Sequence, residues 1–295
     1  MVAIASEISY LRLSNAIGKC VTIRNKSSHR SDNMKTALIT GASSGIGETF
    51  ARELAAKKND LVLIARSQDK LDSLATELST KYDIKTEVIS QDLTEPAAGQ
   101  KVFDAVRAKG LVIDLLINNA GFGDYGAFSD RPLDKQIAML QLNVTAVVEL
   151  TGLFLPQMQQ RGDGAIMNIS SIAAFQPVPY MSVYAATKAF ILNYTEALWA
   201  ENKDKNNNVR ILAVCPGPTK SEFYKRADFP DSATGLNNMT MAKSEKVVKE
   251  SLQALEKNQS TVVAGGFANQ IIANLPRFVP RDLLVSTVGK QFKNI

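Results

Sequence analysis

From Lys35 onward, short apolar runs alternate with longer segments in which apolar residues recur at helical spacing. The short runs are apolar throughout, a pattern typical of strands that are buried on both faces of a parallel sheet. Strand–helix alternation along the whole region predicts an α/β fold with a doubly wound parallel sheet of about seven strands, flanked by helices. We expect the strands at Thr36–Thr40, Leu61–Ala65, Lys85–Ser90, Val112–Ile117, Ala165–Ile169, Val209–Val214 and Thr261–Ala264.

Helical segments fill the intervals between these runs. The longest is expected from about Pro132 to Gln160, and another covers Ser182–Glu201. No Pro/Ser-rich linker and no internal repeat divides the chain. We therefore predict a single folded domain over residues 35–265, an N-terminal extension over residues 1–34 and an amphipathic C-terminal tail over residues 266–295.

Composition narrows the chemistry that this domain can perform. The single histidine, His29, lies in a polar stretch, so histidine-centred metal or triad chemistry is nearly excluded. The two cysteines, Cys20 and Cys215, lie far apart with no CxxC spacing, which fits a reducing, cytoplasmic environment. The net charge of +5 is spread among acids without a basic stripe, so we expect no nucleic-acid partner.

Residues 1–33 differ in composition from the rest of the chain. They contain many serines and five Lys or Arg residues against two acids. This composition fits a transit-like targeting segment, an unstructured leader, or an extension upstream of a translation start at Met34. We favour a dispensable extension over a folded element. No run in the chain reaches the roughly 18 consecutive apolar residues of a membrane span.

The C-terminal tail combines apolar and basic residues. This pattern fits an amphipathic segment that contacts an acidic membrane surface. It fits equally well a pair of helices packed on the domain or on a second subunit. The basic residues are Arg277, Arg281, Lys290 and Lys293, with Asp282 as the only acid.

A glycine-rich turn follows the first expected strand. It reads Thr40-Gly41-Ala42-Ser43-Ser44-Gly45-Ile46-Gly47, with the spacing G-x3-G-x-G. Glycines let the backbone turn tightly and approach a pyrophosphate, while the next helix offers free N–H groups and the positive end of its dipole. Between a strand and a helix, this turn predicts a Rossmann-type dinucleotide site. Its expected members are Gly41, Ser43, Ser44, Gly45, Ile46 and Gly47.

The end of the second strand bears on the identity of the cofactor. An acidic residue there would hold the ribose 2′-hydroxyl and repel a 2′-phosphate. The chain has Ala65-Arg66-Ser67 instead, and a guanidinium matches a phosphate in charge and geometry. We therefore predict NADP(H) as the cofactor. Asp92, after the third strand, is expected either to accept a hydrogen bond from the adenine amino group or to cap the next turn.

Tyr184 and Lys188 lie one turn apart near the start of an expected helix. Residues four apart share a helix face, so the phenol and the ammonium group are close. A tyrosine with a pKa of about 10 is a poor acid–base catalyst at neutral pH, but a neighbouring cation stabilises the phenolate and lowers that pKa. The pair is therefore a candidate to donate a proton to a carbonyl or to accept one from an alcohol.

Several motifs in register make the chain resemble the short-chain dehydrogenase/reductase family over residues 35–221. The segment Asn118-Asn119-Ala120-Gly121 resembles the family's NNAG motif, which supports the sheet and borders the cofactor. The loop after the sixth strand resembles its nicotinamide-side loop, where Ser221 keeps a hydroxyl in place of a frequent threonine. The resemblance implies further cofactor contacts from Asn119, Ala120, Gly121, Tyr184, Lys188, Pro216, Gly217, Thr219 and Ser221.

The resemblance also implies a mechanism. Tyr184 would be the general acid in reduction, and Ser171, thirteen residues before it, would hold the substrate oxygen. Lys188 would bind the nicotinamide ribose and lower the tyrosine pKa. Asn143 would hold a water that links Lys188 to solvent, and Ser170 would point away from the substrate.

The family's activity is hydride transfer between NADP(H) and a carbonyl or secondary alcohol, in a homodimer or homotetramer formed by the helices around Asn143 and Tyr184. The stretches Leu61–Leu78 and Ile166–Ala189 are similar to the branch with 3-oxoacyl-CoA reductases and 17β-hydroxysteroid dehydrogenases, which implies an apolar or lipid-like ketone. Pocket residues are expected from 122–128, 173–182 and 222 onward. The alternative function is a non-catalytic NADP(H)-binding sensor or scaffold, although such relatives usually lose the tyrosine or the lysine.

Overall fold

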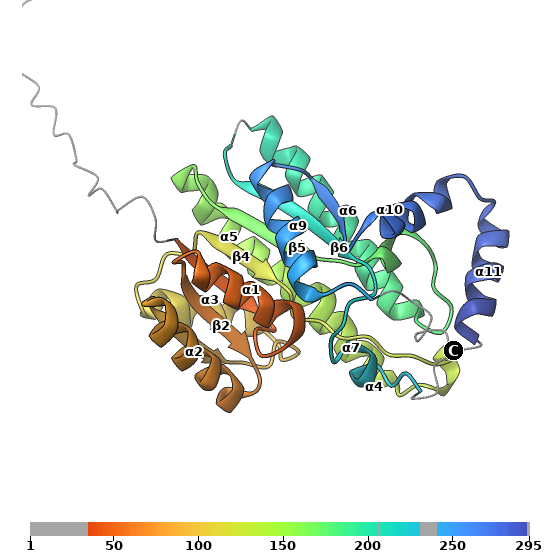
Figure 1. Cartoon of the computed structure of the whole chain (residues 1–295), viewed down its shortest axis with the longest axis horizontal. Helices are drawn as coiled ribbons and strands as arrows, with labels where there is room; N and C mark the ends of the chain where they lie inside the picture. The colour runs from red at the N-terminus through yellow and green to blue at the C-terminus, as the bar shows by residue number, and fades with distance from the viewer. Residues whose placement is uncertain (1–34, 206, 231–240, 294–295) are drawn as a thin grey trace, which may run out of the picture. The chain divides into compact units, whose positions relative to one another are not determined.

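The computed structural model describes residues 35–205, 207–230 and 241–293, so the expected N-terminal extension lies outside the described residues. A seven-stranded parallel sheet has the order β3-β2-β1-β4-β5-β6-β7 (Figure 1). The strand order reverses between β1 and β4, as in a doubly wound sheet, which confirms the predicted fold class. The strands are β1 (Thr36–Thr40), β2 (Asp60–Ala65), β3 (Thr86–Ser90), β4 (Leu115–Asn118), β5 (Ala165–Ile169), β6 (Arg210–Pro216) and β7 (Thr261–Ala264).

The predicted start of the fourth strand at Val112 is wrong, because β4 begins at Leu115. Val112 is exposed, whereas Ile113 packs into the core without joining the sheet. The carboxylate of Asp114 accepts a hydrogen bond from the backbone N–H of Thr36 at 3.0 Å, just before the paired residues begin. The apolar run therefore includes residues that pack next to the strand as well as those that form it.

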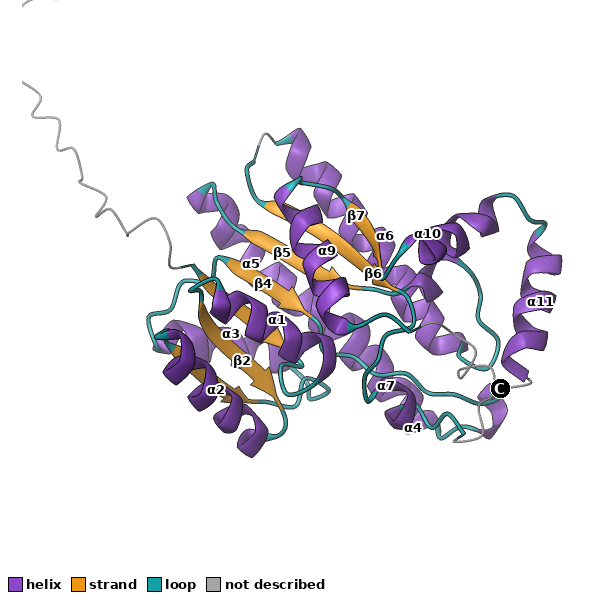
Figure 2. Cartoon of the chain, in the orientation of Figure 1, coloured by secondary structure: helices purple, strands orange, loops and turns teal. Residues whose placement is uncertain are grey.

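Helices cover both faces of the sheet (Figure 2). Successive side chains of β1 enter different apolar cores, Ile39 on one face and Leu38 on the other, because side chains alternate across a strand. The first core is covered by α1 (Gly45–Ala56), α2 (Gln68–Tyr82) and α9 (Ser244–Glu256). The second is covered by α3 (Ala98–Ala108), α5 (Ala146–Arg161) and α6 (Ser182–Asp204).

The helix predicted from Pro132 to Gln160 is interrupted. It consists of α4 (Leu133–Leu140), one π-helical turn (Gln141–Thr145) and α5. Among the described residues, this stretch is the one candidate that is long and apolar enough to cross a membrane by length and composition. Its α5 part packs against the sheet through Leu150, Phe154 and Met158, as a core helix does.

The C-terminal residues form helices. They are α7 (Phe223–Arg226), α10 (Phe267–Asn274) and α11 (Arg281–Lys293). Leu284 and Val288 of α11 are buried in an apolar cluster that also contains Tyr184. The inner face of the tail therefore packs on the domain, which is one of the two arrangements that its pattern allows.

Candidate active site

Hydrogen bonds join the carboxyl ends of β1 and β4 around the glycine-rich turn. Thr40 Oγ1 accepts hydrogen bonds from the backbone N–H groups of Asn119 and Ala120, both at 3.0 Å. Asn119 Nδ2 donates to the carbonyl oxygen of Thr40 at 2.9 Å. Behind them, Asn118 Nδ2 donates to Asn168 Oδ1 on β5 at 2.8 Å. The NNAG segment thus ties the turn to the neighbouring strands.

Two glycines of the turn leave no room for a side chain. Gly41 has a φ of 66°, in the left-handed region that favours glycine, and a Cβ at Gly47 would lie 2.3 Å from the carbonyl oxygen of Gly41. The N-cap residue of α1, Ser44, makes no side-chain capping hydrogen bond within the described structure. The first N–H groups of α1 and the positive end of its dipole therefore remain available to a phosphate.

Arg66 and Asp92 lie at the ends of β2 and β3. Arg66 is 72% exposed, and its Nη1 lies 3.8 Å from Asp92 Oδ2. Asp92 Oδ1 accepts hydrogen bonds from the backbone N–H and hydroxyl of Thr94 at 2.9 and 2.7 Å, so it caps the next turn. Burial pushes the pKa of Asp92 upward, but the Thr94 hydrogen bonds and the Arg66 charge outweigh burial and hold it below its ordinary value.

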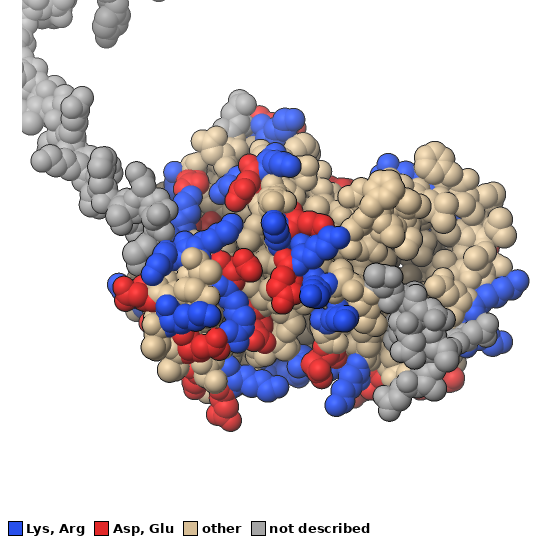
Figure 3. Space-filling model, in the orientation of Figure 1, with Lys and Arg blue, Asp and Glu red and all other residues tan. Residues whose placement is uncertain are grey.

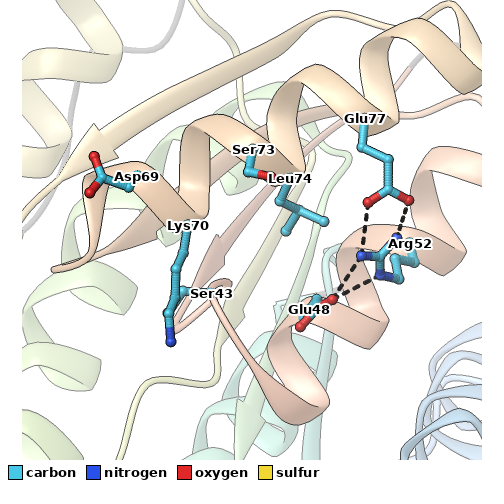
Figure 4. A pocket seen from close by; sticks show the side chains of 8 residues that line it. All are labelled: Ser43, Glu48, Arg52, Asp69, Lys70, Ser73, Leu74 and Glu77. Atoms are coloured by element: carbon cyan, nitrogen blue, oxygen red, sulfur yellow. Dashed lines mark hydrogen bonds and ion pairs between the residues drawn. The ribbon is translucent and has the colours of Figure 1, made fainter.

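A shallow pocket between α1 and α2 adds a cation that the motifs did not indicate. At one end, Arg52 pairs with Glu48 and Glu77; at the other, Lys70 lies near Ser43 of the glycine-rich turn (Figure 4). Lys70 lies in the first turn of α2, four residues after Arg66, and a second cation so soon after the strand is a signal by which it could have been found. The positive charges of Arg66 and Lys70 suit the phosphate end of a dinucleotide.

Tyr184 and Lys188 project from the start of α6 and are buried. Lys188 Nζ lies 5.7 Å from the centre of the Tyr184 ring and donates to the carbonyl oxygen of Ile169 at 2.9 Å. Burial lowers the pKa of Lys188 to about 8. Burial also raises the pKa of Tyr184, with a hydrogen bond from Ser171 acting in the opposite direction. In the protein alone, desolvation of the phenolate thus has the larger effect on the tyrosine pKa, and the lowering of that pKa by Lys188 stays a prediction.

Two adjacent serines after β5 point in different directions. Ser171 begins a 3-10 turn (Ile172–Phe175), where its Oγ accepts a hydrogen bond from Ala173 N at 3.1 Å, and it also interacts with the Tyr184 hydroxyl. Ser170 is buried, and its Oγ donates to the carbonyl oxygen of Lys188 at 2.7 Å. Ser171 thus meets the phenol, whereas Ser170 fastens β5 to α6.

Asn143 lies in the middle of the π-helical turn, a local widening that recurs at functional sites. Its Nδ2 donates to the carbonyl oxygen of Phe122 at 2.9 Å and to Thr187 Oγ1 at 3.1 Å. Both amide protons are therefore engaged within the protein. A Cβ at Gly121 would lie 2.9 Å from Asn143 Oδ1 and 3.4 Å from Lys188 Nζ, so these two groups flank Gly121.

The loop after β6 returns to the glycine-rich turn. It leaves the sheet at Pro216, and Gly217 N donates to the carbonyl oxygen of Ala264 at 3.1 Å. Thr219 Oγ1 donates to the carbonyl oxygen of Gly217 at 2.8 Å and is thus engaged inside the loop. A Cβ at Gly45 would lie 3.4 Å from the Cβ of Ser221, so Ser221 is the residue that the loop brings to the turn.

Apolar side chains form a cluster beside Tyr184, where the ring centre of Phe223 lies 5.3 Å from that of Tyr184. Phe128, which lies in an expected pocket segment, is 56% exposed on a 3-10 turn (Phe128–Asp130) and lies outside this cluster. Phe175 packs in a separate cluster with Leu192. The apolar cluster includes Phe122, Tyr125, Val178, Met181, Phe223, Tyr224 and Phe229.

Four charged side chains brace the segments that carry this cluster, and no sequence motif indicated them. Asp124, whose side chain is fully buried, lies 2.6 Å from both Arg131 Nη2 and Lys135 Nζ. Asp228, just after α7, pairs with the same two cations at 2.6 Å. Burial pushes the pKa of Asp124 upward, but the two cations outweigh it and hold that pKa below its ordinary value. This charge cluster fastens the loop after β4 and the end of α7 to α4.

Comparison with known proteins places this geometry among dehydrogenases. The family model described as short chain dehydrogenase matches residues 35–229. Very-long-chain 3-oxoacyl-CoA reductase from Bos taurus is 40% identical over 198 residues, which cover 64% of this chain and 62% of the bovine protein. The match therefore spans less than two thirds of that relative's length. 17-beta-hydroxysteroid dehydrogenase type 3 from Mus musculus is 30% identical over 260 residues, covering 87% of this chain and 80% of the mouse protein.

A solved structure shows the same architecture. The short-chain dehydrogenase from Sphingobium yanoikuyae in complex with NADPH superposes with a TM-score of 0.71 and 34% sequence identity. The superposition covers 78% of this chain and 87% of the other. The overall fold is thus one that the two chains have in common.

Proposed function

The chain belongs to the short-chain dehydrogenase family, and on that premise we propose that it is an oxidoreductase that transfers a hydride between NADP(H) and an apolar, lipid-like ketone or its alcohol. The observation that carries the proposal is the set formed by the buried Tyr184 and Lys188 with the partly buried Ser171. This set lies between the apolar cluster and Gly121, at the carboxyl ends of the central strands. Ligands of doubly wound sheets bind at that edge.

The residues present fit a nicotinamide cofactor. The glycine-rich turn and the uncapped first turn of α1 would hold the pyrophosphate, and Arg66 with Lys70 would hold a 2′-phosphate. When bound, the cofactor supplies the hydride. Support for NADP(H) over NAD(H) comes from the cation at the end of β2 and from the NADPH complex of the Sphingobium yanoikuyae relative.

The chain's own residues would manage the proton. Tyr184 donates its phenolic proton to the carbonyl oxygen during reduction, while the Ser171 hydroxyl donates a hydrogen bond to the same oxygen. The product alcohol keeps that proton, and the ammonium group of Lys188 stabilises the phenolate that remains. With a pKa of about 8, Lys188 carries its charge at neutral pH. Asn143, beside Lys188 across Gly121, is the position from which a water would return a proton.

Two observations favour a lipid-like substrate. The cluster next to Tyr184 is built from aromatic and aliphatic side chains, so a polar substrate would lose its hydration there without replacement. The bovine relative carries the name very-long-chain 3-oxoacyl-CoA reductase, and the murine relative that of a hydroxysteroid dehydrogenase.

We also propose a homodimer in the cytoplasm, formed through the outer faces of α4, α5 and α6. Large apolar side chains are exposed there, with exposed fractions between 36% and 66%, in a pattern that a second subunit would cover. The exposed side chains are Leu133, Ile137, Leu140, Val148 and Phe190.

We propose that residues 35–265 form the dinucleotide-binding and catalytic domain, with residues 266–295 as an appended segment.

The decisive experiment is NADPH oxidation across ketones of graded chain length, with wild type and Tyr184→Phe. We expect Tyr184→Phe to lower turnover at least about 100-fold, because the general acid is lost, while NADPH binding is retained. Tyr194→Phe, on the same helix, is the matched control and retains turnover. Undiminished turnover in Tyr184→Phe would refute the mechanism. NADPH binding without turnover of any ketone by wild type would favour the sensor or scaffold function.

A further inference from the structure

The surface over α10 and the start of α11 exposes an unusual number of large apolar side chains. Phe267 is 74% exposed and Phe278 is 83% exposed, and the others lie between 41% and 58%. Phe267, Ile271 and Leu275 follow at intervals of four, so they share one helix face. Apolar groups gathered in this way on a soluble domain mark an interaction site. The apolar patch consists of Phe267, Ile271, Ile272, Leu275, Phe278 and Leu283.

Positive charge accompanies the apolar patch. All four basic residues of the stretch are exposed, and Asp282 is its only acid. Figure 3 shows the surface over α10 and α11 as mostly uncharged, with Lys and Arg side chains at its margin. The patch therefore combines apolar contact area with attraction for anions. The four cations are Arg277, Arg281, Lys290 and Lys293.

The helices that carry the patch are fixed to the domain from their inner side. Leu284 and Val288 are buried, and the Tyr125 hydroxyl donates to the carbonyl oxygen of Phe292 at 2.6 Å. Asn269 Nδ2 is buried and donates to the carbonyl oxygen of Ala264 at 3.0 Å. The helices α10 and α11 thus already pack on the domain through other side chains, and the apolar patch is their outer face.

We propose that the apolar patch and its four cations dock this protein on the surface of a membrane that contains anionic lipid. Phenylalanine, leucine and isoleucine side chains enter the boundary between headgroups and acyl chains, while Lys and Arg bind lipid phosphates. A second copy of this chain is a poorer occupant. In a twofold contact the same patch meets itself, and the cations of both copies would face one another.

Docking through this patch would also bring the substrate side of the molecule to the bilayer. The same helix α11 contributes Leu284 and Val288 to the cluster that contains Tyr184. An apolar ketone dissolved in the membrane would then reach the cluster without crossing bulk water. This second step rests on the proposed function, whereas the docking itself does not.

Vesicle sedimentation of the full chain tests the docking. We expect wild type to bind vesicles of phosphatidylcholine with phosphatidylglycerol and to bind pure phosphatidylcholine weakly, with binding reduced by added salt. Phe267→Ser/Phe278→Ser should weaken binding at least about tenfold, because both exposed rings would leave the lipid boundary. Arg277→Glu/Arg281→Glu should remove the preference for anionic vesicles. Because every variant keeps residues 1–33, the differences report the patch alone.

The matched control is Lys81→Glu/Lys85→Glu, which makes the same charge change next to β3 at the opposite edge of the sheet. It should bind nearly as wild type does. Wild-type binding by a folded Phe267→Ser/Phe278→Ser variant, or equal loss in the control, would overturn the proposal. If wild type does not bind vesicles and the serine variant has a lower mass in solution than wild type, the patch is instead a contact between copies of this chain.

An activity measurement separates docking from catalysis. The serine variant should reduce a short, soluble ketone at the wild-type rate but a ketone embedded in anionic vesicles several-fold more slowly. Equal rates on the embedded ketone would overturn the delivery step. Failure of wild type to reduce either ketone would contradict the proposed function, while the sedimentation result would stand on its own.

Discussion

The glycine-rich turn and the apolar cluster beside Tyr184 differ in the kind of contact that builds them. At the turn, Thr40 and Asn119 exchange hydrogen bonds with backbone groups, at positions set by the pairing of β1 with β4. At the cluster, Tyr125 reaches the backbone of Phe292, 167 residues away in the sequence. A contact with the backbone is lost when the backbone shifts, because its atoms cannot move independently. Packed apolar side chains can instead rearrange to fit a substituted neighbour. Substitutions at the turn should therefore have larger effects than substitutions around the cluster.

Gly47→Ala tests the turn and should have the largest effect. Its Cβ would lie 2.3 Å from the carbonyl oxygen of Gly41, so the backbone that faces the pyrophosphate has to shift. Overpacking of this kind costs about 1–3 kcal/mol, and we expect NADPH affinity to fall by roughly 10- to 100-fold. Titration of NADPH fluorescence measures the change.

Gly152→Ala is the control for this prediction. It places the same methyl group in another helix, α5, where no atom lies within 4 Å of the added Cβ. Alanine is the better helix former, so this variant should bind NADPH as wild type does and unfold at an equal or higher temperature. Equal loss of NADPH affinity in both variants would show that any alanine placed at a helix glycine lowers affinity. The loss could then not be attributed to the close contact at Gly47.

Asp228→Asn tests the charge cluster on the substrate side and should have a smaller effect. Asp228 has a φ of 56°, which asparagine tolerates, so the substitution removes charge without forcing the backbone. Arg131 and Lys135 keep their buried partner Asp124. Because exposed ion pairs contribute about 0.2–1 kcal/mol, we expect KM for the ketone to rise by up to about fivefold with no change in NADPH affinity.

Asp163→Asn provides the comparison for Asp228→Asn. It removes an exposed pair with Lys35, at 3.4 Å, from the other end of the parallel strands. KM should not change in this variant. A rise in KM for both variants, or a loss of NADPH affinity in Asp228→Asn, would show that the two sides of the site are not independent.

Most of the sheet could be predicted from sequence because strands buried on both faces leave continuous apolar runs. The apolar run at Val112–Ile117 predicts too early a start for the fourth strand, since Ile113 is buried by packing and not by pairing. The π-helical turn at Gln141–Thr145 has no composition of its own, so it could not be distinguished from an uninterrupted helix. A change of hydrogen-bond spacing within a helix leaves the apolar periodicity almost intact.

Some residues of the candidate site could likewise be predicted from local sequence patterns, and others could not. Tyr184 and Lys188 share a helix face by spacing, and Asn119 follows a strand directly, so local patterns were sufficient to find them. Phe223, Asp124 and Asp228 come from segments that meet only in the folded chain. No local pattern separates such residues from ordinary core and surface positions. Phe128 is the reverse case, because it is an apolar residue of an expected pocket segment that is exposed and lies outside the cluster.

Lys188 lies between the glycine-rich turn and the apolar cluster. Its burial predicts that the free energy of unfolding depends on pH. Its pKa is about 8 in the folded protein against an ordinary 10.5, so below pH 8 folding carries the full penalty of a buried charge. Between those values the unfolded chain binds more protons, and the penalty fades as the pH rises. The shift corresponds to about 3 kcal/mol at pH 7, part of which the hydrogen bond to Ile169 is expected to offset.

Lys188→Met should therefore raise the unfolding temperature of the cofactor-free protein by a few degrees at pH 7, although it removes a group proposed to act in catalysis. At pH 10 the gain over wild type should shrink to about a quarter of its value at pH 7, because the folded lysine is neutral there while the unfolded lysine still binds a proton, and it should vanish only above pH 10.5. Lys203→Met, at an exposed position of the same helix, should show no such trend. A difference between Lys188→Met and wild type that is constant from pH 7 to pH 10 would mean that Lys188 is more fully solvated than its 5% exposure implies.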